Sequence, residues 1–255
     1  MKTLSGFRQF SSLIDNYQYI SSLKKELNLS ADSDSGTSLR DVVLLKGQGL
    51  YVMNYAKNEV VYTRKIKDIL GYNSSEFNSK LINQDLFHPK QKAVMSILLS
   101  SAIKLGVEGS YENTPDVRFI LLYKAKHKEG HYLSILRQTG IFEKDDQGRM
   151  ISVFSMLTDV TGVMESEQVE WRLEGINKDF EAEMERKMSD IIQEVFTASE
   201  LKVLNLLKKG MTTKQIATTL HNSEFTISTH RRNMLRKSNS RNSRELLLFA
   251  ESLGI

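Results

Sequence analysis

The chain has 255 residues, of which 40% are hydrophobic and none is cysteine, and its formal net charge is +4. This length predicts one large domain or two small ones, and the lack of cysteine excludes disulfides, thiolate metal sites and cysteinyl adducts. No run approaches the roughly 18 apolar residues of a membrane span, and the first residues lack the apolar core of an export signal. We therefore expect a soluble cytoplasmic protein that makes no membrane contact.

The first 38 residues are predicted to form an amphipathic helical segment followed by a loop. Apolar side chains recur at three- and four-residue steps over residues 4–29, a spacing that predicts one helix or two with a wide apolar face. That face must pack on the next domain or on a second protomer, and the sequence leaves both alternatives open. Residues 30–38 are rich in serine, aspartate and glycine, which indicates a loop.

Residues 39–162 change to short strands and short helices, the pattern of a small α+β domain with helices on one face of an antiparallel sheet. Each strand is bounded by turn residues such as Glu129-Gly130. The predicted elements are, in order, strands at 49–55 and 60–62, a short helix capped by Thr63 and ended by Gly71, a helix over 91–104, and strands at 117–126, 131–142 and 150–158.

This order resembles that of PAS sensor domains. The resemblance also rests on Ile69-Leu70-Gly71-Tyr72, on Phe87-His88-Pro89 and on a terminal Asp159-Val160-Thr161. It implies a five-stranded antiparallel sheet whose cupped face either holds a small ligand or is filled by side chains. It also implies that the Asp-Val-Thr element couples the last strand to a following helix.

The identity of a ligand for this domain stays open. Aromatic and thioether side chains are candidates to line a cavity, although such residues more often fill a core: Tyr51, Met53, Tyr55, Phe119, Tyr123, Phe154 and Met156. A flavin adduct needs a cysteine, and haem needs an axial ligand for which His88, His127 and His131 are the candidates. Because the last two lie at a turn and the first matches a structural position of the family, we favour a ligand-free domain that serves dimerisation, without cofactor or metal.

Residues 163–195 are predicted to form a linker helix. Apolar residues repeat in steps of three and four, with one interruption midway, at Val169, Leu173, Ile176, Phe180, Met184, Met188, Ile191 and Val195. A heptad pattern with such a stutter is typical of a two-stranded coiled coil that changes phase. The alternative is a helix packed within one protomer, which the large side chains of Trp171 and Phe180 support; we favour the dimer-forming signalling helix, which a cue acting on the preceding domain would bias.

The last sixty residues, 196–255, are predicted to form four short helices. Leu201 to Leu207 carry the first apolar run, Gly210 ends it, and Thr212 or Thr213 caps the second helix. The third helix is predicted to cover residues 224–237 and to bury Phe225, Ile227, Met234 and Leu235. A fourth run covers 243–250. Two short helices joined by a tight turn, the second of them basic, are typical of a helix-turn-helix that offers a recognition helix to the DNA major groove.

This region resembles the LuxR-type helix-turn-helix family along its whole length. The resembling residues are Thr197, 200–204, Gly210, 214–217, 226–230, 233–235, Lys237 and 245–246. Within these stretches, Lys202 and Ser228 differ from the residues usual in the family, and so does the neighbouring Ser199. Because Ser228 lies on the side expected to read bases, the operator preference of the family is not carried over.

Charge supports the same interpretation. Residues 196–255 hold 10 Lys+Arg and 4 Asp+Glu, a net +6, which leaves −2 for the rest because the total is +4. Positive charge confined to one small region is the electrostatic signature of a phosphate-binding surface. The alternative is that these cations merely form a solvated helix face. The candidate DNA-binding residues are Lys214, Thr226, Ser228, Thr229, Arg231, Arg232, Arg236 and Lys237.

The sequence therefore predicts a DNA-binding transcriptional regulator in which a PAS-like domain controls a helix-turn-helix domain. Double-stranded DNA and a second copy of the chain are the expected partners, and RNA polymerase is a candidate third. No phosphate loop, nucleophile elbow or metalloprotease motif occurs, so no enzymatic activity is expected. The alternative function is a protein-interaction module that docks a partner without reading DNA.

Overall fold

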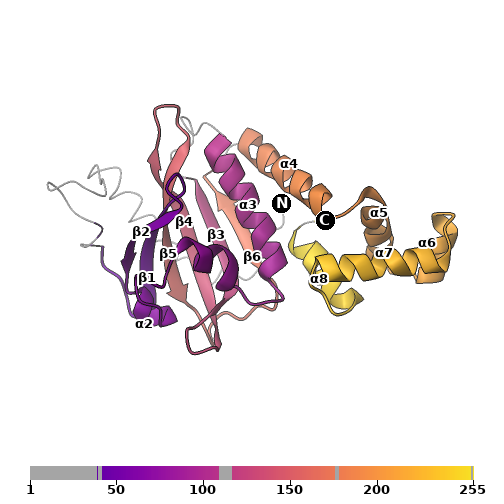
Figure 1. Ribbon diagram of the computed structural model, residues 1–255, viewed down its shortest axis with the longest axis horizontal. Coiled ribbons are helices and arrows are strands. Elements are labelled where there is room, and N and C mark those ends of the chain that lie inside the picture. Colours follow the sequence, from indigo (N-terminus) through magenta and orange to yellow (C-terminus); the bar gives the residue numbers. More distant parts are fainter. Residues whose placement is uncertain (1–38, 40–41, 109–116, 176–177, 254) are drawn as a thin grey trace. The chain divides into compact units, whose positions relative to one another are not determined.

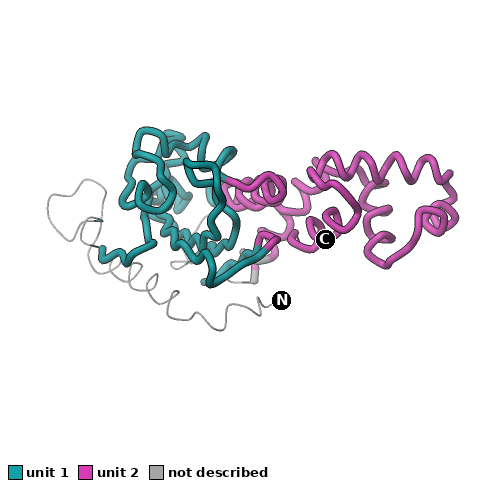
Figure 2. The backbone as a smooth tube through the Cα atoms, turned by 90° about the horizontal axis from the view of Figure 1, so that it is seen from below, with its two compact units in different colours: residues 1–86, 106–166, 170–177 teal, residues 87–105, 167–169, 178–255 magenta. Residues whose placement is uncertain are grey.

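The computed structural model describes residues 39, 42–108, 117–175, 178–253 and 255 (Figure 1). The helical segment predicted over residues 4–29 lies outside this part of the chain. The chain divides into two compact units, which are described separately (Figure 2). The first unit comprises residues 1–86, 106–166 and 170–177, and the second comprises 87–105, 167–169 and 178–255.

The first unit is built on one antiparallel sheet. Its strands follow the order β2-β1-β5-β4-β3-β6. They are β1 (Gln48–Asn54), β2 (Glu59–Arg64), β3 (Arg118–Lys126), β4 (Tyr132–Lys144), β5 (Met150–Asp159) and β6 (Glu170–Glu174). The five strands expected from the PAS resemblance are confirmed, and β6 extends the sheet beside β3.

Local chemistry accounts for the turns between these strands. The β4–β5 turn closes on Asp145, whose Oδ1 accepts hydrogen bonds from the backbone N–H groups of Gln147 (3.0 Å) and Arg149 (2.8 Å). Gly148 follows with φ of 74°, a left-handed conformation that glycine adopts without steric cost. The hairpins predicted at this turn and at Glu129-Gly130 are both confirmed.

Helix α2 (Ile66–Leu70) forms where the sequence predicted a short helix, and Gly71 ends it with φ of 77°. The predicted cap is wrong. Lys65 occupies the N-cap position in a left-handed conformation and makes no side-chain cap bond, whereas the hydroxyl of Thr63 bonds with that of Ser74 at 2.7 Å. Thr63 lies in β2, two residues before the N-cap position, and its hydroxyl bonds with Ser74 instead of the first helical N–H groups.

Both faces of the sheet are buried, and they differ in character. One face carries apolar clusters formed in part by Leu50, Val52 and Phe154 of the strands and by the segment that precedes β1. The other face carries Tyr51, whose ring meets Phe77 edge-to-face at 5.3 Å. Because neighbouring strand residues point to opposite faces, the predicted cavity-lining set divides between them: Tyr51, Met53, Phe119 and Tyr123 on one face, and Phe154 and Met156 on the other.

The Asp159-Val160-Thr161 element ends β5 and ties it to β4. The Thr161 N–H and hydroxyl both donate to Asp159 Oδ1, at 3.0 and 2.6 Å, and Thr161 Oγ1 accepts from the Ser134 N–H at 2.9 Å. The expectation that a helix follows this element is wrong. Turns follow it and then β6, since Gly162 has φ of 77° and bends the chain back toward the sheet.

The prediction of one helix over residues 163–195 is also wrong, because residues 170–174 form strand β6. Trp171 lies opposite Leu121 of β3 and meets the Phe119 ring edge-to-face at 6.3 Å. Glu174 pairs with Arg118 at 2.8 Å. Aromatic residues favour strands, and these cross-strand contacts override the helical spacing. The first half of the predicted heptad pattern therefore lies partly in a strand, and the helix begins only at Lys178.

Helix α4 (Lys178–Val195) forms the second half of the predicted linker. Its apolar residues Met184, Met188, Ile191 and Ile192 are each less than a tenth exposed within a single chain. This covered face favours the alternative in which the helix packs within one protomer. The remaining helical elements before it are the π-helical turn η2 (Leu81–Asp85) and helix α3 (Lys92–Glu108).

We expect Gly71→Ala to destabilise the protein by about 2–3 kcal/mol, measured by chemical denaturation. About 1 kcal/mol comes from a left-handed alanine and the rest from a clash. An added Cβ would lie 2.9 Å from the His127 ring and 3.1 Å from Lys128 Cβ. Gly162→Ala is the matched control, because φ is also 77° there but nothing lies within 4 Å. Equal losses in the two variants would contradict the clash.

Candidate functional site

Four helices form the C-terminal part of the second unit, as predicted. They are α5 (Ala198–Lys208), α6 (Thr213–Thr219), α7 (Glu224–Lys237) and α8 (Ser243–Ser252). Each begins after a residue whose side chain accepts a bond from the helix backbone, and these caps are Thr197, Thr212, Ser223 and Asn242. Thr212 and not Thr213 therefore caps α6, in a capping box with Gln215.

Apolar side chains fix α7 against its neighbours. Helix α7 contacts α5, α6 and α8, and its own Ile227 and Met234 are completely buried. Burial of a side chain of this size contributes about 1.5–3 kcal/mol. Phe196, at the end of α4, meets Phe249 of α8 edge-to-face at 5.8 Å. The orientation of α7 about its own axis is therefore set by the side that holds Ile227 and Met234.

Two residues predicted to be buried on α7 are not. Phe225 is exposed to solvent, with 79% of the residue accessible, and Leu235 is half-buried. Phe225 precedes the buried Ile227 by two positions, which is a rotation of about 200° around a helix. The sequence placed Phe225 inward because it is apolar, but the spacing to Ile227 turns it outward.

The outward side of α7 carries a continuous stripe of exposed side chains. Phe225, Ser228, Arg232 and Arg236 follow one another at steps of three and four residues, and all four are exposed. We call these four residues the α7 stripe. An apolar ring, a hydroxyl and two guanidinium groups on one helix face are able to contact base edges and phosphates together. Sequence reasoning missed Phe225, although its spacing to Ser228 and Arg232 could have revealed it.

The other predicted contacts lie beside this stripe. Lys214 is exposed in the first turn of α6. Thr226 is half-buried, and its hydroxyl bonds with that of the cap Ser223 at 2.8 Å. Thr229 is half-buried next to Ser228. Lys214 and Thr229 are thus accessible at least in part, whereas the hydroxyl of Thr226 already helps to begin α7.

Arg231 is held inside the domain. Its Nη1 donates to Thr213 Oγ1 at 2.5 Å, and its Nη2 donates to Ser243 Oγ at 2.6 Å. These two hydroxyls belong to the first residues of α6 and α8. The planar guanidinium therefore joins three helices, α6, α7 and α8, and its donors point away from the α7 stripe.

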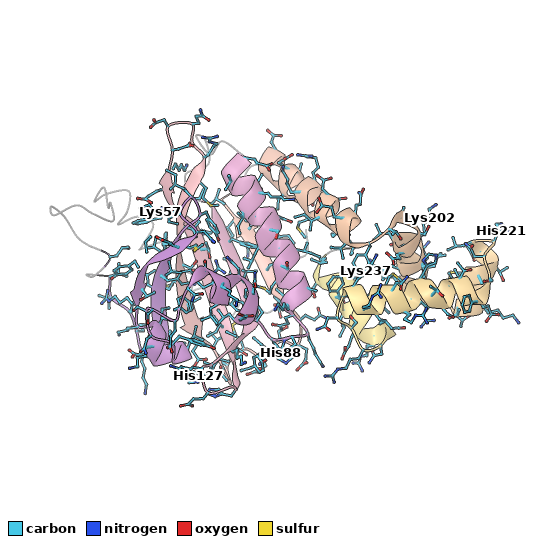
Figure 3. All side chains as sticks on the ribbon, viewed as in Figure 1. Lys57, His88, His127, Lys202, His221 and Lys237 are labelled. Atoms are coloured by element: carbon cyan, nitrogen blue, oxygen red, sulfur yellow. The ribbon has the colours of Figure 1, made fainter. Side chains whose placement is uncertain are left out.

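Lys237 is also engaged within the domain, as an ion pair with Glu200 of α5. Its Nζ donates to Glu200 Oε2 at 2.7 Å, and Glu200 is only 2% exposed (Figure 3 labels Lys237, with Lys202 of α5 above it). Burial raises the pKa of the Glu200 carboxyl, but hydrogen bonds from Lys237 and from the backbone N–H of Thr197 outweigh it. The pKa of Glu200 consequently lies below its ordinary value.

A second notable group is Arg137, a cation buried in the sheet of the first unit with 2% of the residue exposed. Its Nε donates to Thr139 Oγ1 at 3.0 Å and to Ser155 Oγ at 3.3 Å, and its guanidinium lies 5.5 Å from the centre of the Tyr51 ring. Tyr123 also bonds to it, and burial raises the pKa of that phenol well above its ordinary value, so the phenol is neutral. Arg137 is thus surrounded by neutral partners.

The histidines considered as haem ligands take part in local turns. His88 is half-buried, and its Nδ1 accepts from the Lys90 N–H at 3.2 Å. His127 and His131 close the β3–β4 turn through the bond from His127 N–H to His131 O at 2.8 Å. The side chain of His88 thus helps to hold its own turn, whereas the bond between His127 and His131 is made by their backbones.

Residues 194–250 match the sequence family described as "Bacterial regulatory proteins, luxR family". This match covers helices α5 to α7 and most of α8, and it agrees with the resemblance noted on the sequence. No curated protein matches the chain.

Solved structures with similar chains include both regulators and sensor domains. The phage VqmA–DPO complex is 18% identical, covers 94% of this chain and 91% of its own, and has a TM-score of 0.30. The Vibrio cholerae VqmA–ligand–DNA complex is 14% identical, covers 86% and 89%, and scores 0.32. The N-terminal domain of a Marinobacter aquaeolei diguanylate cyclase with a PAS/PAC sensor is 18% identical, covers 45% and 95%, and scores 0.37. Scores this low carry no argument about this chain.

Within the residues that the structure describes, no helix has the length and apolar character needed to cross a bilayer.

Lys237→Met is expected to lower the free energy of unfolding by about 1–3 kcal/mol, because it leaves the buried Glu200 carboxylate without its charged partner. Chemical denaturation followed by circular dichroism measures the loss. Lys202→Met on α5 is the control, because Lys202 is exposed and its change should cost less than about 0.5 kcal/mol.

The pH dependence of the stability lost in Lys237→Met shows whether the ion pair causes that loss. The lowered pKa of Glu200 contributes stability that is present above the ordinary value of 4.5 and lost as the pH falls through the folded pKa. In Lys237→Met that pKa rises, so the variant should be closest to the native protein in strongly acidic solution. A difference in stability that stays constant from neutral pH down to acid would show that packing, and not the ion pair, had been lost.

Proposed function

We propose that the chain is a sequence-specific DNA-binding transcriptional regulator whose α7 enters the major groove. The observation that carries this proposal is the α7 stripe, a set of exposed reading groups on a helix that is capped and fixed by its buried side. A helix that follows a short first helix and a tight turn docks in this way. The match of residues 194–250 to a family of bacterial regulators supports the same conclusion.

The accessible side chains divide into base contacts and phosphate contacts. Ser228, Thr229 and Arg232 lie in the middle of α7 and are assigned to base edges, where arginine pairs with guanine O6 and N7. Lys214 and Arg236 are assigned to phosphates on either side. Phe225 joins the base contacts, because an aromatic ring packs well on the thymine methyl group.

Arg231 and Lys237 serve this function indirectly. Both are among the DNA-binding candidates of the sequence, but each donates to side chains of its own domain. We assign them to positioning: Arg231 orients α7 relative to α6 and α8, and Lys237 orients it relative to α5. Thr226 is likewise assigned to positioning, because its hydroxyl bonds with the cap residue Ser223.

The regulator is proposed to act as a homodimer on two half-sites. A single helix reads only a few base pairs, and two recognition helices about 34 Å apart meet successive major grooves. The apolar side of α4 is covered within one chain, so a change that frees this side would alter pairing between protomers. A cue that acts on the sheet domain would change operator affinity by shifting the equilibrium between the covered and the freed state of α4.

Arg137 favours a sensing role for the sheet domain. A buried arginine stays charged, and its neutral partners compensate only part of the cost of removing it from water. A small carboxylate or another oxyanion would supply the opposite charge. Such an anion should raise the melting temperature of the native protein and leave that of Arg137→Lys unchanged, since a lysine cannot bind a carboxylate in bidentate fashion. A panel of small anions with no such effect would leave the sheet domain as a dimerisation module.

The competing function is a protein-interaction module, for example one that docks RNA polymerase, without DNA readout. The salt dependence of binding distinguishes the two functions. Each phosphate contact releases counterions, so affinity for DNA falls as the salt concentration rises. Selection of bound sequences from a random pool of duplex DNA tests the proposal directly. A recovered motif with two half-sites about 10 base pairs apart supports it, and recovery of random sequence at low salt overturns it.

Arg232→Ala is expected to cost about 1–3 kcal/mol of affinity for the selected operator and to relax one base position. Lys214→Ala should instead weaken binding to all sequences alike and reduce the salt slope by about 1. Repeating the selection with each variant measures both effects. A uniform loss in Arg232→Ala would assign that residue to phosphate.

Phe225→Ala should relax a preference for thymine at one position of each half-site and leave the salt slope unchanged, because the contact is apolar. Since the side chain is exposed, the variant should fold as the native protein does. An operator with uracil in place of that thymine provides the matched control, because it lacks only the methyl group. If the native protein binds both operators equally, Phe225 does not read this methyl group.

A further inference from the structure

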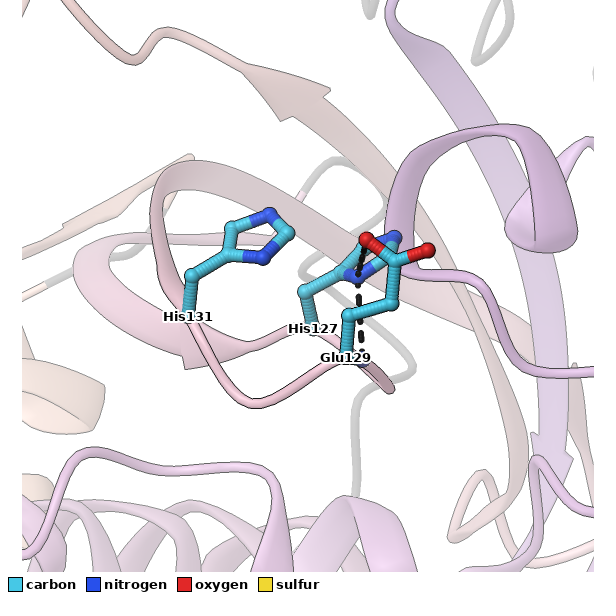
Figure 4. Close-up of side chains that lie close together, drawn as sticks. All are labelled: His127, Glu129 and His131. Atoms are coloured by element: carbon cyan, nitrogen blue, oxygen red, sulfur yellow. Dashed lines mark hydrogen bonds and ion pairs between the residues drawn. The ribbon is translucent and has the colours of Figure 1, made fainter.

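We propose that the β3–β4 turn of the sheet domain binds a divalent transition-metal ion of the Zn²⁺ class through His127, Glu129 and His131 (Figure 4). This site is separate from the DNA-binding surface, and the inference does not depend on the proposed function.

The backbone of the turn brings the three side chains together. The His127 N–H donates to His131 O at 2.8 Å, and the Gly130 N–H donates to His127 O at 2.9 Å. Gly130 has φ of 97°, which allows the chain to reverse after Glu129. Ligand atoms from all three side chains lie within 4.8 Å of one another. Rotation of the exposed side chains would bring each ligand atom to about 2.0–2.2 Å from a central ion, the usual length of a bond from zinc to nitrogen or oxygen.

The imidazole rings are near one another but stacked, so the exposed His131 must turn before both rings point a nitrogen at one ion. Their centroids are 4.3 Å apart with 22° between the ring planes, and the Glu129 carboxylate lies 3.8 Å from His127 Nδ1 (Figure 4). This Nδ1 accepts from the Glu129 N–H at 3.2 Å, so it faces the Glu129 backbone at the surface of the turn. A metal at Nδ1 would replace this long hydrogen bond with a coordinate bond.

The position of the His127 ring is fixed by the domain around it. Cε1 and Nε2 of this ring lie so close to Gly71 that a Cβ there would approach them to 2.9 Å. The next residue, Lys128, donates its N–H to Leu70 O at 2.9 Å, and its Nζ pairs with Glu76 at 2.7 Å. One ligand is thus held against the end of α2, while Glu129 and His131 are exposed and free to close around an ion.

The donor set selects the kind of metal. Two imidazoles and one carboxylate are ligands that Zn²⁺, Ni²⁺ and Cu²⁺ prefer, whereas Mg²⁺ and Ca²⁺ require mostly oxygen ligands. Three protein ligands leave at least one position for water. Bound metal would cross-link the two sides of the β3–β4 turn and so stabilise this end of the sheet domain.

Isothermal titration of ZnCl₂ into the full-length, tag-free and chelator-treated protein tests the site in the absence of DNA. We expect one Zn²⁺ per chain, with affinity reduced at least 10-fold in His131→Ala and in Glu129→Gln. His221→Ala is the control, because His221 is an exposed histidine of the other unit and should have no effect (Figure 3 labels both His127 and His221).

A second measurement identifies the ligands. X-ray absorption of the zinc-loaded protein should give two imidazole nitrogens in the native chain and one in His131→Ala. The inference is overturned if no saturable binding occurs, if MgCl₂ binds equally well, or if His221→Ala weakens binding as much as His131→Ala does. Because none of these readouts involves DNA, failure of this site and failure of the proposed regulator function are distinguishable.

Discussion

The burial of Ile227 and Met234 decides which residues this protein offers to a partner. Both side chains are completely buried on one side of α7, and the residues of the α7 stripe lie on the opposite side. Rotating the helix to hide Phe225 would expose these two side chains, at a cost of about 1.5–3 kcal/mol for each. An exposed phenylalanine is therefore the result of a better core, and its place on the α7 stripe is the basis of the base contact proposed for it.

Polar contacts make this orientation more specific than apolar packing alone would. The Glu200 carboxylate is buried, caps its own helix through the Thr197 N–H and receives the Lys237 ammonium. Such a pair adds little net stability, because desolvation offsets the attraction, but any other arrangement leaves a buried charge unpaired. Arg231 also fixes the orientation of α7, because its guanidinium donates to the hydroxyl groups of Thr213 and Ser243. Arg231 and Lys237, which are proposed to position α7, thus hold in place the cations that are proposed to contact DNA.

Features that depend on nearby residues could be predicted from the sequence, and those that depend on distant residues could not. Helix ends were found because caps such as Thr212 act within three residues. The five strands were found because turn residues bound them. By contrast, Lys237 has its partner 37 positions away, and in β6 Trp171 and Glu174 pair with residues of β3 that lie 50 and 56 positions earlier. Helical spacing alone cannot reveal such long-range pairing.

The internal use of two cations has a consequence for binding. Residues 196–255 contain ten Lys+Arg, and Arg231 and Lys237 are committed to the fold. If Lys214 and Arg236 are the principal phosphate contacts of one domain, the salt slope of a single domain is only about −2, since each contact contributes about −0.9. One domain would then bind non-specific DNA weakly. Two linked domains double the phosphate and base contacts, and the second binds at the high local concentration that the first creates. If the proposed function holds, operator recognition would depend on pairing of two chains, and whatever governs that pairing would control DNA binding.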